Sequence, residues 1–177
     1  LFCDNPQIYL PHTGIKLIYH DGDMRKKEYF TGNIINLLDN SIDFLKKILV
    51  DTNYPIEPII ECISNAVVHR DYFDHSREIV INIGKNKIEI SNPGSISHRD
   101  RINNIIKEQN PFRRNNWLYQ RLLVLDNQNR FMKSGLGLQK IKDSFKNIGK
   151  VQFLNLRKKN LFKIILPGLN AVNKDED

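Results

Sequence analysis

The sequence predicts a single α+β domain, in which amphipathic helices and short alternating strands share one core. Three observations lead to this expectation: 177 residues suit one domain with a core, 40% of them are hydrophobic, and helical and strand periodicities both recur along the chain. The chain begins at Leu1 and lacks the charged and apolar regions of a signal peptide. We therefore expect it to be a portion of a longer protein.

The first element that we expect is a strand within residues 1–30, which we interpret as an N-terminal arm or edge strand from a preceding domain. Apolar side chains alternate at Ile15, Leu17 and Tyr19, which is the period of a strand. The sequence DGD follows soon afterwards, and acidic residues beside glycine are typical of a turn.

Two helices are predicted next, within a main domain that we place at residues 31–168. Residues 33–50 carry isoleucine and leucine at spacings of three and four, which is typical of an amphipathic helix. A second helix should begin near Pro55, because proline is tolerated in a first helical turn. The apolar stripe of this second helix continues to Val67.

The second half of the chain is predicted to mix strands and short helices. The runs REIVINIG and KIEIS predict a hairpin that turns at residues 84–86. Isoleucines from Ile102 onward and the run WLYQRLLVL each predict a short helix, and KSGLGLQKI predicts a turn that leads into another. The runs VQFLNL and LFKIILP predict the last two strands, and we expect residues 169–177 to form a disordered tail.

Charge and cysteine content narrow the expected partners and compartment. Lysine and arginine total 27 against 20 acidic residues, a formal charge of +7, which favours an anionic partner such as nucleic acid or a nucleotide. Cys3 and Cys62 lie far apart without metal-ligand spacing, so we expect a cytoplasmic protein without a disulfide framework or zinc site. No apolar run approaches the roughly 20 residues that span a bilayer, so we expect no membrane insertion.

The run ECISNAVVHRDY places several polar groups on the second predicted helix. Glu61 and Asn65 are four positions apart, so they project from the same face about one turn apart, and His69 continues that row. Asparagine offers a neutral oxygen to Mg²⁺, and glutamate orients or deprotonates water, which makes the pair suited to phosphate chemistry. The alternative is that both side chains are simply solvated.

Two glycine-bearing turns accompany this helix. Asn92 and Gly94 follow directly after a predicted strand, and Gly135 and Gly137 stand at the start of a predicted helix. Backbone N–H groups at a helix N-terminus form an anion site where no Cβ blocks the approach, and Lys133 adds positive charge to it. The alternative is an ordinary flexible turn before a helix.

The order of these motifs resembles the GHKL or Bergerat ATP-binding fold of gyrase-type topoisomerases, ATP-dependent heat-shock chaperones, MutL proteins and histidine kinases. More closely, the runs YPIEPIIECISNAVVHRDY, IEISNPGSI and QNPFRRN are similar to the C-terminal ATPase-like domain of certain bacterial transcriptional regulators. Those regulators carry an N-terminal Schlafen AlbA-type domain and are often labelled helicases or divergent AAA proteins. The resemblance covers roughly residues 5–168.

This resemblance implies a two-layer α/β sandwich, with a mixed β-sheet that carries helices on one face, and a lid at residues 95–134. It also implies ATP and Mg²⁺ as ligands. The implied roles are the water-activating base for Glu61, the Mg²⁺ ligand for Asn65, the adenine side for Asn92 and Gly94, and the phosphate side for Gly135 and Gly137.

Some residues depart from the family pattern or keep several roles open. The GHKL families usually have aspartate where Asn92 stands, and Ile96 replaces the second glycine of that box. No Walker A sequence is present, which excludes a P-loop mechanism. In the run HRDY, His69 and Asp71 have three open roles, namely a helix C-terminal cap, a ligand contact or an interdomain contact. We count Asp71 with the cofactor-binding candidates.

Two functions from different classes follow. The first is an ATP-binding regulatory domain of a bacterial transcriptional regulator, with slow or absent hydrolysis, whose DNA contacts lie mainly in other domains. The alternative is a degenerate scaffold that binds no nucleotide and acts in DNA binding or homodimer formation. The nucleic-acid candidates are Arg113, Arg114, Lys158 and Lys159, although runs of charge are usually solvated surface.

Overall fold

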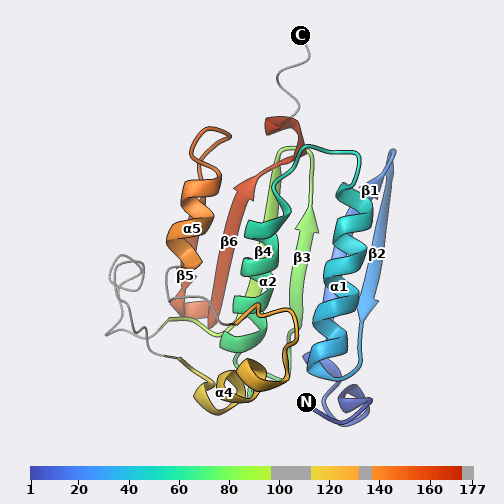
Figure 1. Cartoon of the computed structure of the whole chain (residues 1–177), viewed down its shortest axis with the longest axis vertical. Coiled ribbons are helices and arrows are strands. Elements are labelled where there is room, and N and C mark those ends of the chain that lie inside the picture. The colour runs from blue at the N-terminus through green and yellow to red at the C-terminus, as the bar shows by residue number, and fades with distance from the viewer. Residues whose placement is uncertain (97–112, 132–136, 173–177) are drawn as a thin grey trace.

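The protein forms an α+β fold in which one mixed sheet carries helices on one face, as expected (Figure 1). The computed structural model describes residues 1–96, 113–131 and 137–172. Its six strands follow the order β2-β1-β3-β4-β6-β5. Helices α1, α2 and α5 lie over the sheet, and α4 crosses the end at which α2 finishes. Isoleucine and leucine side chains from both layers form one continuous core.

The N-terminal strands belong to the same sheet as the rest of the domain. Strand β1 (Ile15–Asp21) pairs with the antiparallel strand β2 (Met24–Phe30) on one side and with the parallel strand β3 on the other. The expectation that this first strand is an arm or an edge is therefore wrong, because β2 occupies the edge. Strand β1 is interior because both of its edges are paired, with Ile15 opposite Phe30 of β2 and opposite Ile79 of β3.

The two predicted helices are confirmed as α1 (Ile34–Leu49) and α2 (Ile56–His69). The side-chain oxygen of Asn33 caps α1 by accepting hydrogen bonds from the backbone N–H groups of Ile35 and Asn36 at 3.1 and 3.0 Å. Helix α2 begins directly after Pro55. Both helices bury their apolar stripes against the sheet.

The predicted hairpin is also confirmed. Strands β3 (Ile79–Ile83) and β4 (Lys87–Pro93) are antiparallel and bring Ile83 opposite Ile88. Every second residue of both strands is buried, as expected when one face of a sheet is covered. Helix α2 packs directly on β4.

The C-terminal half contains the other predicted elements. These are α4 (Asn116–Leu125), α5 (Gly137–Ser144), β5 (Gln152–Leu156) and β6 (Leu161–Pro167). Short 3-10 turns complete the fold: η1 (Pro6–Ile8), η2 (Pro11–Thr13), η3 (Arg157–Lys159) and η4 (Leu169–Ala171). The helix predicted from Ile102 lies outside the described residues.

The start of the expected disordered tail is ordered. The N–H groups of Leu169 and Asn170 donate to the carbonyl oxygens of Gly84 and Lys85 at 3.3 and 2.9 Å. These bonds attach η4 to the turn between β3 and β4, which is why disorder does not begin at residue 169. Among the described helices, none is both long and apolar enough to cross a membrane.

Candidate functional site

Glu61 and Asn65 form a hydrogen-bonded pair on α2. The Asn65 amide nitrogen donates to Glu61 Oε1 at 2.9 Å, and both residues are half-buried. The prediction that they share one face of the helix is confirmed. The carboxylate and the carboxamide thus bind each other while both side chains keep part of their surface exposed.

The first residue of α5, Gly137, lies directly against this pair. A Cβ at this position would stand 2.1 Å from Glu61 Oε1 and 3.3 Å from the Asn65 amide nitrogen. Any other residue type at this position would displace the carboxylate from where it now lies. The structure therefore joins two motifs that are far apart in the sequence. Gly135 and Lys133 lie outside the described residues.

Asn92 provides a third polar group on the neighbouring strand. It lies on β4, on the same buried face as Ile88 and Ile90, and is only 5% exposed. Its Oδ1 atom has no hydrogen-bond partner among the described residues. An unpartnered buried acceptor costs about 1–3 kcal/mol, and functional sites are where such a cost is typically retained.

Asp71 and Gly94 contact each other, but away from the Glu61–Asn65 pair and Gly137. Gly94 has a φ of 117°, and a Cβ on it would lie 3.0 Å from the backbone nitrogen of Asp71. That nitrogen donates to the carbonyl oxygen of Pro93 at 2.7 Å. The junction lies beyond the end of α2, at least roughly 12 Å along the helix from Glu61 at 1.5 Å per residue. The structure thus divides the predicted site residues into two groups.

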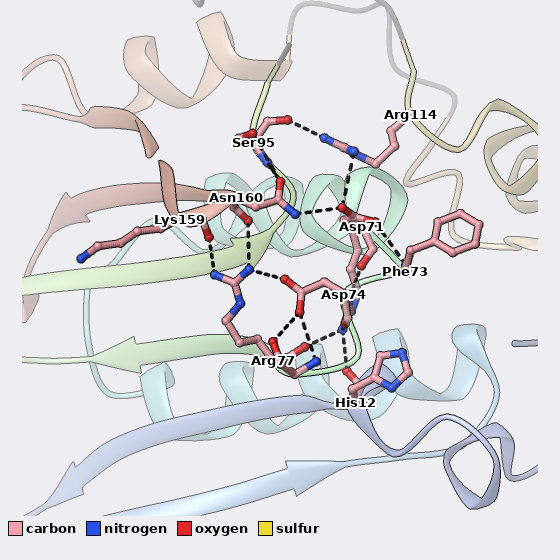
Figure 2. Close-up of polar contacts among 11 residues, drawn as sticks. His12, Asp71, Phe73, Asp74, Arg77, Ser95, Arg114, Lys159 and Asn160 are labelled. Atoms are coloured by element: carbon pink, nitrogen blue, oxygen red, sulfur yellow. Dashed lines mark hydrogen bonds and ion pairs between the residues drawn. The ribbon is translucent and has the colours of Figure 1, made fainter. Parts of the chain in front are cut away.

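The Asp71 carboxylate is occupied by contacts within the protein (Figure 2). It accepts hydrogen bonds from the Asn160 amide at 2.9 Å and from the backbone nitrogen of Phe73 at 3.1 Å. The Arg114 guanidinium lies 3.8 Å away and also donates to the carbonyl oxygen of Ser95. These contacts join the end of α2 to the turns after β4 and β5, a role inside the domain that differs from the three left open by the sequence.

Asn160 is central to this junction and was not singled out from the sequence. It adopts a left-handed conformation with φ 43° and ψ 50°, and its carbonyl oxygen accepts from the Gly94 N–H at 2.8 Å. Its side-chain oxygen accepts from the Ser95 N–H at 2.9 Å. An asparagine in a polar turn between two strands is the available sequence signal, because asparagine tolerates this conformation better than most residues.

Arg70 has a structural role. It is fully buried, and its guanidinium donates to the carbonyl oxygens of His12 and Asp74 at 2.9 and 3.1 Å. It also donates to the carbonyl oxygens of Asp71 and Arg77. One side chain thereby fixes the loop after α2 and connects it to the N-terminal segment. A charged group that satisfies several buried carbonyls is costly to replace.

His69 ends α2 in a buried, positively charged setting. Burial, together with the charges of Arg113 and Arg114, lowers the pKa of His69 to about 4. Arg113 also stacks on the Tyr119 ring, with 4.1 Å between the guanidinium carbon and the ring centre. His69 is therefore neutral at physiological pH, which favours a packing role over a charged contact.

The four nucleic-acid candidates differ in their contacts. The Arg114 guanidinium points into the Asp71 junction, whereas the Lys159 side chain points away from it (Figure 2). Lys158 and Lys159 are exposed in η3. Arg113 is half-buried against Tyr119. The arginines thus have contacts inside the domain, and the two lysines are free to meet an anion.

Mg²⁺ would find few protein ligands of its own here. Within residues 1–96, 113–131 and 137–172, no cluster of three or more histidine, cysteine, aspartate or glutamate residues is arranged to hold a metal. A single amide oxygen from Asn65 fits the usual behaviour of Mg²⁺ at nucleotide sites, where phosphates and water fill the remaining positions. Asn65 would therefore supply one oxygen ligand to such a metal.

Comparison with known proteins identifies the fold and no family. No protein-family model matches the chain, and no curated protein is significantly similar to it. The fold is similar to the crystal structure of the DIP2311 protein from Corynebacterium diphtheriae, with a TM-score of 0.67 and 18% sequence identity. The match covers 90% of this chain and 34% of that chain, so the present chain spans about a third of the matched protein. At this identity the likeness shows a shared architecture only.

Proposed function

We propose that this domain binds ATP with Mg²⁺ between α2 and the start of α5, and that it is the regulatory domain of a bacterial, cytoplasmic transcriptional regulator of GHKL type. Hydrolysis is slow or absent. The observation that carries the proposal is the contact between Gly137 and the Glu61–Asn65 pair. It supports a site in which a helix N-terminus, a carboxylate and a carboxamide converge.

Each residue would supply one part of the chemistry. Asn65 offers its amide oxygen to the metal that accompanies the phosphates. Glu61 is placed to orient water, and the first turn of α5 directs backbone N–H groups toward negative charge. Asn92 offers an unpartnered acceptor in the layer between α2 and the sheet, where an amino group of the base would satisfy it. The Mg²⁺ supplies charge neutralisation when bound.

Thermal unfolding with and without ATP and Mg²⁺ tests the proposal. A ligand that binds only the folded state stabilises it by about 2.7 kcal/mol at a hundredfold excess over its dissociation constant. We expect a clear rise in the unfolding temperature that disappears in Asn65→Ala. The matched control is Asn147→Ala, because Asn147 is exposed and lies outside both α2 and α5. No shift in the unmodified protein at millimolar nucleotide would reject the proposal.

Turnover separates binding from hydrolysis. If Glu61 activates water, Glu61→Ala should remove any ATP hydrolysis while the nucleotide-dependent rise in unfolding temperature largely remains. Glu57→Ala is the control, since Glu57 is exposed one turn earlier on the same helix. Equal turnover in the Glu61 variant and the control would remove Glu61 from the mechanism.

A degenerate scaffold without a nucleotide is the alternative function. The observation that favours it is that Glu61 and Asn65 bind each other and fill the space against Gly137. In that case the domain would act through DNA binding or dimer formation. DNA contacts made through Lys158 and Lys159 should weaken steeply with salt, so binding of duplex DNA at two ionic strengths, with and without Lys158→Ala, discriminates this function from the first.

A further inference from the structure

Three segments that are distant in the sequence form one end of the molecule, where α2 finishes. These are residues 1–14, residues 70–77 and residues 113–131. Arg70 donates to the carbonyl oxygen of His12, and the Asn115 side chain donates to the carbonyl oxygens of Val68 and Arg70, both at 2.7 Å. Figure 1 shows the N-terminus and α4 together at this end. We call this surface the α2-end surface.

Large exposed hydrophobic side chains gather on the α2-end surface. Of the ten that the described residues contain, seven belong to its three segments. The seven and their exposed fractions are Phe73 92%, Tyr9 80%, Val124 80%, Ile8 74%, Trp117 63%, Leu125 48% and Phe2 37%. Scattered apolar residues on a surface are ordinary, but a concentration of them marks an interaction site.

The charged residues of these segments point to a protein partner. Four arginines of these segments are not buried, namely Arg77, Arg113, Arg114 and Arg121, and the segments contain neither lysine nor glutamate, although the chain has 17 lysines. The interiors of protein–protein interfaces are enriched in aromatic residues and arginine and depleted in lysine and glutamate. A surface that binds nucleic-acid phosphates would be expected to use lysine as well. The composition therefore favours protein over nucleic acid.

Phe73 is held in place although almost nothing covers it. Its backbone N–H donates to the Asp71 carboxylate at 3.1 Å, and Asn160 holds that carboxylate from the other side at 2.9 Å. Arg70 fixes the same loop from within. Figure 2 shows the Phe73 ring pointing away from this network. Because the backbone that carries the ring is already fixed, only the two side-chain torsions lose freedom when a partner covers it, which is a property of aromatic binding anchors.

We propose that the α2-end surface is the interface of a homodimer, in which a second copy of this chain covers it. At about 200 Å² for each aromatic ring, the exposed parts of the four aromatics supply roughly 500 Å². The three aliphatic residues bring the total toward the roughly 800 Å² per partner of a stable interface.

The surface is also suited to pairing with itself. It carries exposed aromatic rings together with Arg121, which already stacks on the Trp117 ring at 5.2 Å. In a two-fold interface a residue on one subunit meets a different residue on the other. Arginines of one copy can therefore lie over aromatic rings of its partner, and cation–π contacts strengthen when water is excluded. This inference is independent of the proposed nucleotide site, whose residues Glu61, Asn65 and Gly137 lie outside the three segments.

Sedimentation equilibrium over a range of concentrations tests the dimer. We expect the unmodified chain to approach twice its 20.7 kDa mass, and Phe73→Glu and Val124→Glu each to raise the dimer dissociation constant about 30-fold or more. Both side chains are highly exposed, so the folded monomer should tolerate the changes, and circular dichroism checks this. The matched controls are Met24→Glu and Val50→Glu, which are 65% and 70% exposed on other parts of the molecule.

Two results would overturn the inference. A chain that stays monomeric at about 100 μM, where even weak dimers associate, would assign the surface to a different partner. A dimer that survives both α2-end variants but dissociates in a control variant would place the interface elsewhere. Asn65→Ala should leave the mass unchanged, which keeps this test separate from that of nucleotide binding.

Discussion

The backbone of Gly137 approaches the carboxylate of Glu61 so closely that a methyl group on it would stand 2.1 Å from Oε1. The neighbouring atom is the far end of a flexible side chain. We therefore expect Gly137→Ala to displace the carboxylate and break the Asn65–Glu61 hydrogen bond, with a change of only about 1 kcal/mol in the free energy of unfolding. Urea denaturation measures the cost.

A double-mutant cycle separates this contact from helix propensity. In a Glu61→Ala background the methyl group has room, so Gly137→Ala should be neutral or stabilising there, since alanine is the better helix former. The same effect in both backgrounds would contradict the contact. Gly168→Ala provides the contrast: its methyl group would lie 2.2 Å from the backbone of Asn86, which cannot move away, so we expect a loss of several kcal/mol.

We expect Asn92 to lower the stability of the fold while contributing to nucleotide binding. Leucine has nearly the same shape and removes the unpartnered Oδ1 from the core, so Asn92→Leu should raise the free energy of unfolding by about 1 kcal/mol. If the proposed site is correct, the same variant should lose the stabilisation by ATP and Mg²⁺. Chemical denaturation with and without nucleotide measures both quantities. A variant that is destabilised by more than about 1 kcal/mol would show that this amide has a structural partner.

The left-handed turn at Asn160 should depend on its side chain as well as its backbone. Asn160→Gly keeps the conformation but removes the bonds to Ser95 and Asp71, so we expect a loss of about 1–2 kcal/mol in the free energy of unfolding. Asn129→Gly is the control, because Asn129 is exposed with a φ of 54°. It should change stability by less than about 0.5 kcal/mol. Equal effects would mean that the backbone alone matters.

Acid should destabilise the fold through His69. Its pKa is about 4 in the folded protein and about 6.5 in the unfolded chain, so the unfolded state binds more protons between these values. Stability therefore falls as the pH drops from about 6.5 to 4, by at most about 3 kcal/mol at 1.4 kcal/mol per pKa unit. Burial also lowers the pKa of His12, with the same sign. His69→Gln should flatten the decline measured by urea denaturation at several pH values, whereas exposed His20→Gln should not.

Much of the fold follows from periodicity. The isoleucine and leucine spacing in α1 and the alternation in β3 and β4 predict their elements because the same side chains form the core. The place of β1 did not follow, since a strand pattern says nothing about which strands flank it. Only the pairing in the folded sheet, where Ile15 lies opposite both Phe30 and Ile79, reveals that partners lie on both sides.

The candidate site was predictable in part. Four-residue spacing places Glu61 and Asn65 together because helix geometry is fixed. Their contact with Gly137 depends on tertiary packing of α5 against α2, which spacing alone does not contain. The sequence also did not predict that Asp71 lies apart from Glu61, Asn65 and Gly137. The reason is that α2 ends between Asn65 and Asp71, and the direction of the chain beyond a helix end does not follow from spacing. Arg70 illustrates the same limit, since its partners are backbone carbonyls that carry no sequence signal.

The parallel pairing of β1 with β3 has a consequence for how the protein opens. It is the seam at which the N-terminal hairpin joins the four-stranded remainder, with Ile15 opposite Ile79. On each side of this β1–β3 pairing lies a hairpin, whose strands are close in the sequence. The β1–β3 pairing itself joins strands that are far apart in the sequence, so forming it costs the entropy of closing a long loop. Amide exchange should therefore show β1 and β2 with α1 opening together as one cooperative unit, at lower free energy than β3, β4 and β6. Partial unfolding of the N-terminal hairpin and α1 would then leave the Glu61–Asn65 pair on α2 and the neighbouring strand β4 intact.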